Sequence, residues 1–467
     1  MFARRLKPGL PFRRIALVLS GGGALGAYEV GVLKVLEGIA LAPALVAGVS
    51  IGAVNAVVWL AHGRRTAALE RTWRQLRGSH IGLHWLTLAL RAAGGFGAAM
   101  ALLQIVLTLL GSREMSGAYW IWKQASASID LFSTQLDLAF WLLLALVCLG
   151  IMLWARRIEA VLTGGAPMAE ASRGRRVLGR VTLALALAHT VVWAFGWPWP
   201  HRFSASLLIV LALAWLGSGT GDVARFLQRT GFSLLPETGG RGLWGGRARR
   251  RLIEQLVEQG DPSRLVGPGT GLVIGALALD RGHVTHFVSW PDITNAFRER
   301  VEQQLGDVVT MRDAAAVISA AVASSAIPGL FEPETIDGRE FVDGGGFSNQ
   351  PLHVAIANDA DAILVVLLAP SDSPARGDPP ADLFQLAGRL LELANWRDLQ
   401  TELRSLPEGW NRRGDPARVC VVEPERPLPG SVLGFDPGQA EMLIELGARD
   451  AWRALEHAGW LEEHDAE

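Results

Sequence analysis

Four long segments without a charged residue limit how this chain can fold more than any other feature. They occur close together and are 18 to 20 residues long: Ala92–Gly111, Leu138–Ala155, Val181–Pro200 and Phe203–Gly221. A helix needs about 20 apolar residues to cross the hydrocarbon core of a bilayer, whereas apolar runs of roughly 10–14 residues are more typical of buried core helices. The segments therefore predict four membrane-spanning helices. A helical lid over a soluble domain is the alternative.

The composition agrees with membrane association and narrows the possible functions. Hydrophobic residues make up 50% of the chain, the 53 glycines add about 11% (53/467), and only 19% of residues are charged. Soluble domains have roughly 45–50% apolar residues with glycine included, and about 25% charged residues. A net charge of −1 provides no basic field for nucleic acid. The two cysteines, Cys148 and Cys420, are far apart, which argues against a disulfide framework or a cysteine metal site.

Basic residues predict the orientation of the four helices. Arginines are concentrated before the first apolar segment, between the second and the third, and after the fourth. These regions carry 14 arginines: Arg64, Arg65, Arg71, Arg74, Arg77, Arg91, Arg156, Arg157, Arg173, Arg175, Arg176, Arg180, Arg225 and Arg229. The alternate connections carry three basic residues, Arg113, Lys123 and Arg202. Because basic loops stay on the cytoplasmic side, both ends of the chain are expected in the cytoplasm. Arginine outnumbers lysine 41 to 3 (44 − 3 = 41), which is typical of a GC-rich bacterial genome. With the four predicted spans, we therefore expect the protein in a bacterial inner membrane.

Outside this insertion, short apolar runs alternate with helical patterns. Strands are expected at 15–19, 45–49, 272–279, 283–288, 340–342, 362–367 and 419–422, and helices at 24–36, 53–60, 314–324, 382–395 and 437–457. Segment 239–251, rich in glycine and arginine, is expected to be a solvated loop that leads into a helix. Strands that alternate with helices form a mostly parallel sheet covered on both faces. We therefore expect an α/β domain in two parts, 1–82 and 222–467, interrupted by an all-α insertion at 83–221.

The first expected strand runs into a glycine-rich turn, Gly21-Gly22-Gly23-Ala24-Leu25-Gly26. This spacing fits a dinucleotide-binding turn, which also needs an acidic residue about 20 positions later. The corresponding region, 41–50, contains no acidic residue. The favoured alternative is an oxyanion loop, in which consecutive glycine amides point at the start of a helix and stabilise negative charge.

A second motif, Gly48-Val49-Ser50-Ile51-Gly52, follows the expected strand 45–49 and opens a helix. That context is the one a nucleophile elbow requires, because small flanking residues allow a tight turn that exposes the serine hydroxyl. The motif alone is weakly specific. The glycine-rich turn upstream makes the interpretation of Ser50 as a nucleophile much stronger.

A serine nucleophile needs a base, and no supporting pattern surrounds the histidines His62, His283, His286 and His353. Asp343 is the better candidate, because it ends an expected strand and is followed by glycines that allow close approach. A free aspartate has a pKa of about 3.9. Burial beside Ser50 would raise that pKa toward a useful basicity. Standing alone, Asp343-Gly344 would be interpreted as a turn that caps a strand.

Together these motifs resemble the patatin-like phospholipase family. The matching residues are Ser20–Gly26 with the continuation Ala27–Leu33, then Gly48–Gly52, the stretch Ala320–Pro333, and Asp343–Gly345. The resemblance covers about 1–75 and 250–460. It implies an αβα sandwich, a Ser–Asp dyad, no metal or organic cofactor, and hydrolysis of acyl esters with membrane lipids as substrate. The apolar insertion departs from the family's pattern.

Carried over by position, the resemblance implies that Ser50 is the nucleophile and Asp343 the base. Gly21, Gly22 and Gly23 would line the oxyanion hole, and five further glycines would support the motifs: Gly26, Gly48, Gly52, Gly344 and Gly345. Acyl transfer by the same dyad is one alternative. A non-enzymatic membrane protein that senses lipid or acts as a scaffold is another. Ser324 and Ser325 are rival serines, but their helix–Pro setting favours packing roles.

Overall fold

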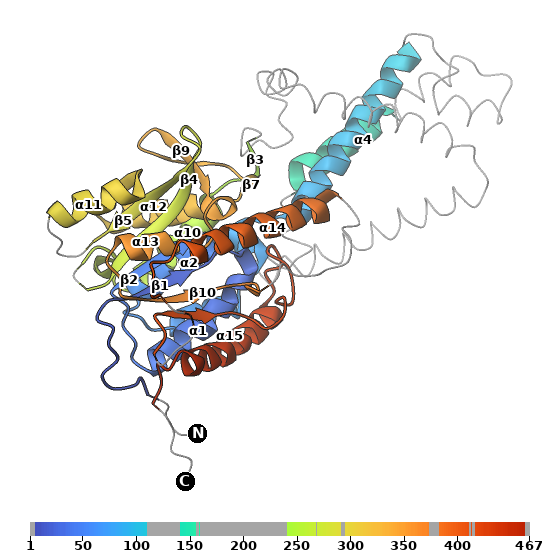
Figure 1. Ribbon diagram of the computed structural model, residues 1–467. Helices are drawn as coiled ribbons and strands as arrows, with labels where there is room; N and C mark the ends of the chain where they lie inside the picture. Colours follow the sequence, from blue (N-terminus) through green and yellow to red (C-terminus); the bar gives the residue numbers. More distant parts are fainter. Residues whose placement is uncertain are drawn as a thin grey trace, which may run out of the picture. The chain divides into compact units, whose positions relative to one another are not determined.

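The computed structural model describes residues 5–109, 141–155, 158, 241–267, 269–290, 295–372, 383–410, 412 and 416–462. The chain divides into two compact units. One combines Met1–Leu83 with Trp244–Glu467, and the other is His84–Leu243. Of the helices labelled in Figure 1, α4 (Trp85–Leu109) belongs to the second unit and the others to the first.

Nine strands among the described residues form one sheet, whose main order is β11-β10-β1-β2-β4-β5-β6. They are β1 (Ile15–Leu19), β2 (Leu45–Val49), β4 (Gly271–Ala278), β5 (Val284–Ser289), β6 (Val308–Thr310), β8 (Glu334–Ile336), β9 (Arg339–Asp343), β10 (Ala362–Val366) and β11 (Val419–Val422). Neighbours from β11 to β4 run parallel, as do β5 and β6. Strands β5 and β9 pair antiparallel with β4, and β8 with β9. The prediction of an α/β fold with a mostly parallel sheet is confirmed.

Helices follow most strands of this unit. They are α1 (Ala27–Gly38), α2 (Ile51–Ala61), α3 (Ala67–Trp73), α10 (Arg247–Glu258), α11 (Asn295–Leu305), α12 (Ala314–Ser324), α13 (Leu352–Ala357), α14 (Leu383–Arg404) and α15 (Pro437–His457). A short 3-10 turn, η1 (Gly23–Gly26), precedes α1, so this helix starts later than the sequence pattern predicts. The pattern ends α14 at 395, but the helix continues to Arg404.

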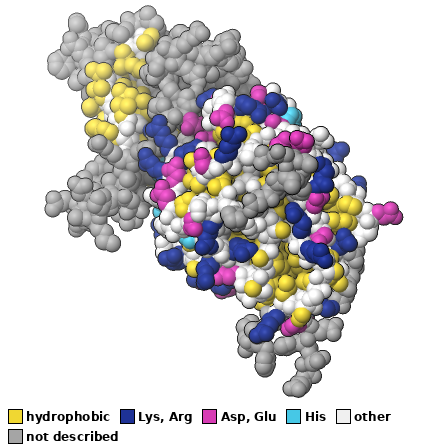
Figure 2. Space-filling model, turned by 90° about the vertical axis from the view of Figure 1, so that its left-hand side faces the viewer, with side chains coloured by type: hydrophobic (Ala, Val, Ile, Leu, Met, Phe, Trp, Pro, Cys, Tyr) yellow, Lys and Arg dark blue, Asp and Glu magenta, His cyan; other side chains and the backbone are white. Residues whose placement is uncertain are grey.

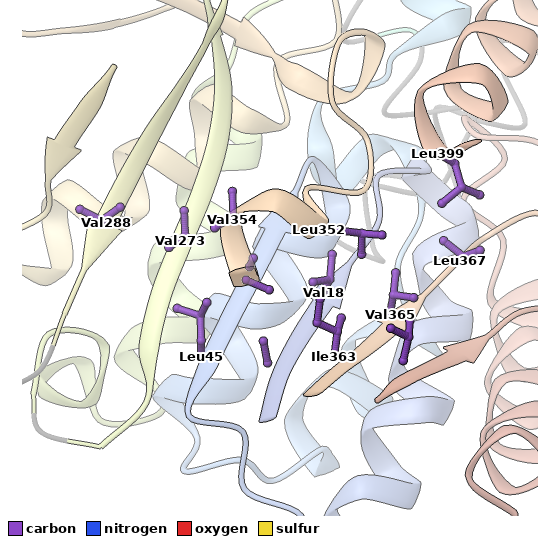
Figure 3. Close-up of a cluster of buried hydrophobic side chains, with 14 residues drawn as sticks. Val18, Leu45, Val273, Val288, Leu352, Val354, Ile363, Val365, Leu367 and Leu399 are labelled. Carbon is purple, nitrogen blue, oxygen red and sulfur yellow. The ribbon is translucent and has the colours of Figure 1, made fainter. Parts of the chain in front are cut away.

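The central strands are buried on both faces, as their continuous apolar sequences require. Alternate side chains such as Val18 and Val365 pack against Leu352 of α13 and Leu399 of α14 (Figure 3). Side chains such as Leu17 point to the opposite face and are fully buried there. The side chains that pack with Val18 and Val365 include none from α1, α2, α12 or α15. These four helices cover the opposite face.

The second unit is helical where it is described. Helix α4 (Trp85–Leu109) contains most of the first predicted span, and the helical segment 141–155 contains most of the second. Within the described residues, one helix is long and apolar enough to cross a membrane, the 21 residues Leu86–Val106 of α4. The predicted spans Val181–Pro200 and Phe203–Gly221 lie outside the described residues.

Glycines let α4 and the segment 141–155 pack closely. A Cβ atom at Gly94 would lie 2.6 Å from the carbonyl oxygen of Cys148, and one at Gly97 would lie 2.5 Å from its Sγ. Small residues permit this kind of close helix contact in membrane proteins. Large apolar side chains such as Leu143 and Leu153 are exposed on this unit, and Figure 2 shows hydrophobic side chains on its described part.

Candidate active site

Ser50 lies in a sharp turn between β2 and α2. Its backbone has φ 55° and ψ −125°, a conformation that non-glycine residues rarely adopt, and the residue is only 5% exposed. Such strain persists only where the surrounding structure enforces it, and it concentrates at functional sites. The local geometry is that of a nucleophile elbow.

Gly48 and Gly52 are sterically required at this elbow. A Cβ atom at Gly52 would lie 2.5 Å from the carbonyl oxygen of Leu19, and one at Gly48 would lie 2.8 Å from the backbone nitrogen of Ala53. Both distances are shorter than real Cβ atoms tolerate. The turn can therefore close only with glycine on each side of Ser50.

Ser324, at the end of α12, fixes the backbone of the elbow. The Ser50 N–H donates a hydrogen bond to Ser324 Oγ (2.8 Å), and the Ser324 hydroxyl donates to the carbonyl oxygen of Gly275 (2.6 Å). Its neighbour Ser325 donates instead to carbonyl oxygens within α12. Ser324 thus links the elbow to β4, a role that the sequence pattern alone does not indicate.

The sheet register brings Asp343 to Ser50. Strands β2 and β9 pair with successive parts of β4, so that Val49 is opposite Gly275 and Asp343 is opposite the next residue, Ala276. The chain that leaves β2 at Ser50 therefore meets the end of β9. The Ser50 hydroxyl donates to Asp343 Oδ2 at 2.5 Å.

The glycines after Asp343 hold its carboxylate. The Gly345 N–H donates to Asp343 Oδ1 at 2.8 Å, so both carboxylate oxygens accept hydrogen bonds. A Cβ atom at Gly344 would lie 3.2 Å from the carbonyl oxygen of Gly275, which leaves little room for a larger residue. Gly344 therefore allows the aspartate loop to lie close to β4.

Burial makes Asp343 a stronger base than a free aspartate. The residue is 8% exposed, and burial raises its pKa to about 6, against the lowering effects of hydrogen bonds from Ser50 and Gly345 and of the positive charge of Arg249. The direction is the one expected from sequence. A carboxylate with this pKa is largely ionised at neutral pH, yet it accepts a proton more readily than an ordinary aspartate.

Arg249 is a component of the site that sequence reasoning missed, because the arginine-rich segment around it predicts a solvated loop. The segment instead begins α10 at Arg247, and Arg249 is only 5% exposed. Its Nη2 donates to the carbonyl oxygen of Val322, and its guanidinium lies 4.2 Å from the ring centroid of Phe331. Burial lowers the pKa of Arg249 to about 10, so it stays charged at neutral pH.

The glycine-rich turn lies against Ser50, and its three predicted amides differ in availability. The Gly21 N–H donates to Oδ1 of Asn349 at 3.0 Å. Within the described part of the chain, the amides of Gly22 and Gly23 donate to no acceptor. Gly23 has φ +55°, and a Cβ atom there would lie 2.2 Å from the carbonyl oxygen of Val432. Gly22 and Gly23 therefore supply the free donors.

Gly26 lets the turn approach α2. A Cβ atom at Gly26 would lie 2.5 Å from Cγ1 of Ile51, the residue that follows the predicted nucleophile. The supporting glycine of the first motif thus faces the second motif. The glycine-rich turn and the elbow are therefore in close contact.

Comparison with protein families places this site in a known context. The family model described as patatin-like phospholipase matches residues 17–133 and 194–356, together more than half of the chain. The chain belongs to the patatin-like phospholipase family. Family membership supports lipid acyl hydrolase activity in general terms. Residues 134–193, which the family model does not match, lie within the predicted insertion.

The crystal structure of VipD from Legionella pneumophila matches over 99% of this chain and 71% of that chain, with 12% identity and a TM-score of 0.36. The search of curated proteins found no match.

An apolar cavity adjoins Ser50 in this patatin-like protein. Its volume is about 70 Å³, and most of its walls come from α2, the segment 69–83, and α10. The apolar side chains around it are Ile51, Val54, Val58, Leu69, Trp73, Leu76, Ile81, Leu83, Leu252, Ile253, Leu256, Ile327, Phe331, Leu433 and Phe435. Ser50 and Arg249 are among its few polar residues. The space that reaches the predicted nucleophile is therefore lined mainly by hydrocarbon groups.

The histidines of the patatin-like domain make their contacts with groups other than Ser50 and Asp343. His62 Nε2 is 2.9 Å from the carbonyl oxygen of Leu256, and His353 Nδ1 is 2.5 Å from Oε1 of Glu402. The His286 ring packs on that of His353, with 5.5 Å between the centroids. Among the described residues, no histidine contacts Ser50 or Asp343 through a hydrogen bond, and no group of three metal-ligating side chains is present.

Proposed function

We propose that the protein is a membrane-associated lipid acyl hydrolase that cleaves carboxylic esters through an acyl-enzyme, with Ser50 as nucleophile and Asp343 as base. The hydrogen bond between Ser50 Oγ and Asp343 Oδ2, made within a strained elbow, carries this proposal. A serine hydroxyl that is hydrogen-bonded to a buried carboxylate of raised pKa has its proton acceptor already in place.

The reaction follows from these positions. Asp343 takes the proton of the Ser50 hydroxyl while Oγ attacks the ester carbonyl carbon. The amides of Gly22 and Gly23 donate to the oxygen that becomes negative, and such donors stabilise the tetrahedral intermediate. Asp343 then returns the proton to the leaving alcohol as the ester bond breaks, which leaves the acyl group on Ser50. Water then attacks the acyl carbonyl carbon while Asp343 accepts its proton. Asp343 returns that proton to Ser50 Oγ as the acyl–oxygen bond breaks, which releases the fatty acid and restores the serine.

The cavity and Arg249 have distinct roles in this proposal. The apolar walls around Ser50 take the acyl chain, whose burial is favourable at about 25 cal/mol per Å². Arg249 favours the ionised form of Asp343, because its positive charge, like the stronger effects of the hydrogen bonds from Ser50 and Gly345, opposes the effect of burial on the pKa of that carboxylate. No cofactor enters these steps.

Isotope labelling of the product tests hydrolysis directly. Purified protein is mixed with phospholipid vesicles in water enriched in ¹⁸O, and the released fatty acid is analysed by mass spectrometry. Hydrolysis of the acyl-enzyme places one ¹⁸O atom in each fatty acid molecule. Acyl chains found only on an added acceptor alcohol would indicate the acyltransferase alternative, and the absence of any turnover would favour a non-enzymatic lipid-sensing or scaffold role.

We also propose that residues 83–221 form a membrane domain with four spans, and that segments 1–82 and 222–467 fold together on the cytoplasmic side of a bacterial inner membrane. The apolar helix α4 and the 14-to-3 distribution of basic residues support this topology. An even number of crossings is also needed for Ser50 and Asp343 to lie on the same side.

Cysteine accessibility tests the topology. With Cys148 and Cys420 replaced by alanine, single cysteines are introduced by Ser128→Cys or Ser172→Cys and exposed to an impermeant maleimide in intact cells. We expect the Ser128→Cys protein to react and the Ser172→Cys protein to react only after the cells are opened. The reverse pattern would show an inverted orientation. A protein that is fully soluble without detergent would contradict the membrane domain and favour the helical lid.

A further inference from the structure

Asn349 makes an unusual double contact with the glycine-rich turn. Its side-chain Oδ1 accepts a hydrogen bond from the Gly21 N–H at 3.0 Å, and its Nδ2 donates to the carbonyl oxygen of the same glycine at 3.2 Å. The residue is 7% exposed, so both bonds are shielded from water. A single carboxamide thus pairs with both polar groups of one backbone residue, much as a neighbouring strand would.

The same residue belongs to the loop that follows Asp343. A Cβ atom at Gly345 would lie 2.9 Å from Asn349 Oδ1 and 3.1 Å from Asp343 Oδ1, which shows how tightly this loop is folded. The Asn349 backbone N–H donates to Asp398 Oδ2 of α14 at 3.3 Å. Asn349 therefore joins the glycine-rich turn to the aspartate loop and to a helix behind it.

Gly21 is in turn in close contact with the elbow. A Cβ atom at Gly21 would lie 2.4 Å from Asn349 Oδ1 and 3.0 Å from the Cβ of Ser50. The next two residues, Gly22 and Gly23, have the free amides. Fixing Gly21 therefore fixes where those amides point relative to the Ser50 hydroxyl.

We propose that Asn349 is a positioning residue that holds the amides of Gly22 and Gly23 in register with Ser50 Oγ, so that they meet the oxyanion as it forms. This inference rests on the proposed hydrolase function. Asn349 itself contacts neither substrate nor reacting atoms. Its effect is expected on kcat, because a misplaced oxyanion donor weakens transition-state binding more than ground-state binding.

The requirement for both a donor and an acceptor makes this proposal testable with two variants of similar size. Leucine in Asn349→Leu offers neither group. In Asn349→Asp, the carboxylate still accepts from the Gly21 N–H but faces the Gly21 carbonyl oxygen without a proton to donate. When that aspartic acid is protonated, its hydroxyl donates to the carbonyl, and the pattern of the carboxamide is restored.

The experiment measures kcat and KM for a p-nitrophenyl ester from pH 8 to pH 5 with wild type and both variants. At pH 8 we expect kcat of each variant to fall by roughly 10²-fold, the usual effect of one lost oxyanion donor, with KM changed little. As the pH falls to 5, the Asn349→Asp to wild-type ratio of kcat should rise by about tenfold or more, because the introduced carboxyl takes up a proton. The Asn349→Leu ratio should stay constant.

Other titrating groups near this position are shared by all three proteins. They are Asp343, the α14 carboxylate Asp398 with Glu402 and His353 beside it, and Glu29, which accepts a hydrogen bond from the Ser20 backbone. Because all three proteins contain these groups, a change of the ratio with pH that occurs in Asn349→Asp and not in Asn349→Leu is due to the introduced carboxyl group.

Asn358→Asp is the matched control. Asn358 is also buried, and its side chain donates to the Val354 carbonyl oxygen and accepts from Trp290 Nε1, but it lies outside the site. We expect its kcat ratio to be independent of pH. Thermal unfolding establishes that each protein is folded, and Asn349→Ser replaces any variant that is not. For that smaller variant the expected result is the same loss in kcat without a change in KM.

A pH-independent ratio for Asn349→Asp, or wild-type kcat in Asn349→Leu, would overturn the positioning role. A loss confined to KM would also contradict it. These outcomes are distinct from failure of the proposed function, in which the wild type itself would not hydrolyse esters or Ser50→Ala would remain active.

Discussion

Replacing Asp343 by asparagine is expected to lower kcat/KM for ester hydrolysis by about 10²–10⁴-fold, the usual effect of losing a general base. The carboxamide has nearly the same size and can still accept a hydrogen bond from Ser50 Oγ, but it cannot take up the proton. Wild-type kcat/KM should rise with pH through about 6, because the base works only when ionised. The residual kcat/KM of Asp343→Asn should not show this rise with pH. Initial rates on a soluble ester across pH 5–8 measure both effects.

Asp337→Asn provides a control for this substitution, since Asp337 is an exposed aspartate in the turn between β8 and β9. Its activity and pH profile should match those of wild type. Near wild-type activity in a folded Asp343→Asn protein would contradict the assignment and return the role of base to a histidine.

Ser50→Ala is expected to lower lipid hydrolysis by roughly 10³-fold or more, because no acyl-enzyme can form without the Oγ atom. Binding to lipid vesicles should be unchanged, since the walls of the apolar cavity stay intact. Fatty-acid release and vesicle co-sedimentation of the same preparation separate the two effects. Equal losses of hydrolysis and vesicle binding would mean that Ser50 serves binding rather than chemistry.

The parts of the site that sequence predicts are those with local signatures. Ser50 is flanked by glycines and lies between a buried strand and a helix, and each of these features occurs within a few residues of it. Asp343 likewise ends a strand and precedes glycines. The steric constraint on Gly48 comes from Ala53 in the same turn, so the local residue pattern carries it.

Residues that depend on distant parts of the chain could not be found in this way. Ser324 and Asn349 act on backbone groups of Ser50 and Gly21, and only the folded structure brings these pairs together. The sequence also predicts the Gly21 amide for the oxyanion hole. In the folded chain this amide already donates to Asn349, a contact between distant residues that the sequence does not reveal. Arg249 was missed because arginine is normally exposed, and its burial depends on the carbonyl of Val322 and the ring of Phe331.

The fold was predictable to a similar extent. Apolar runs locate most strands of the central sheet, and their alternation with helices correctly predicts a mostly parallel arrangement. The antiparallel pairing of β5 and β9 with β4 was not predicted, because register and direction depend on which strands meet after the chain has folded. The pairing of β9 with β4 is what places Asp343 next to Ser50.

Covalent labelling tests the central assignment most directly. Wild type and Ser50→Ala, solubilised in detergent, are treated with a serine-directed fluorophosphonate, and the modified peptide is sequenced by mass spectrometry; Ser405→Ala, which changes an exposed serine at the end of α14, is the control. We predict one adduct, on Ser50, in wild type and in Ser405→Ala, and none in Ser50→Ala. An adduct on a different serine, or labelling that persists in Ser50→Ala, would contradict the account.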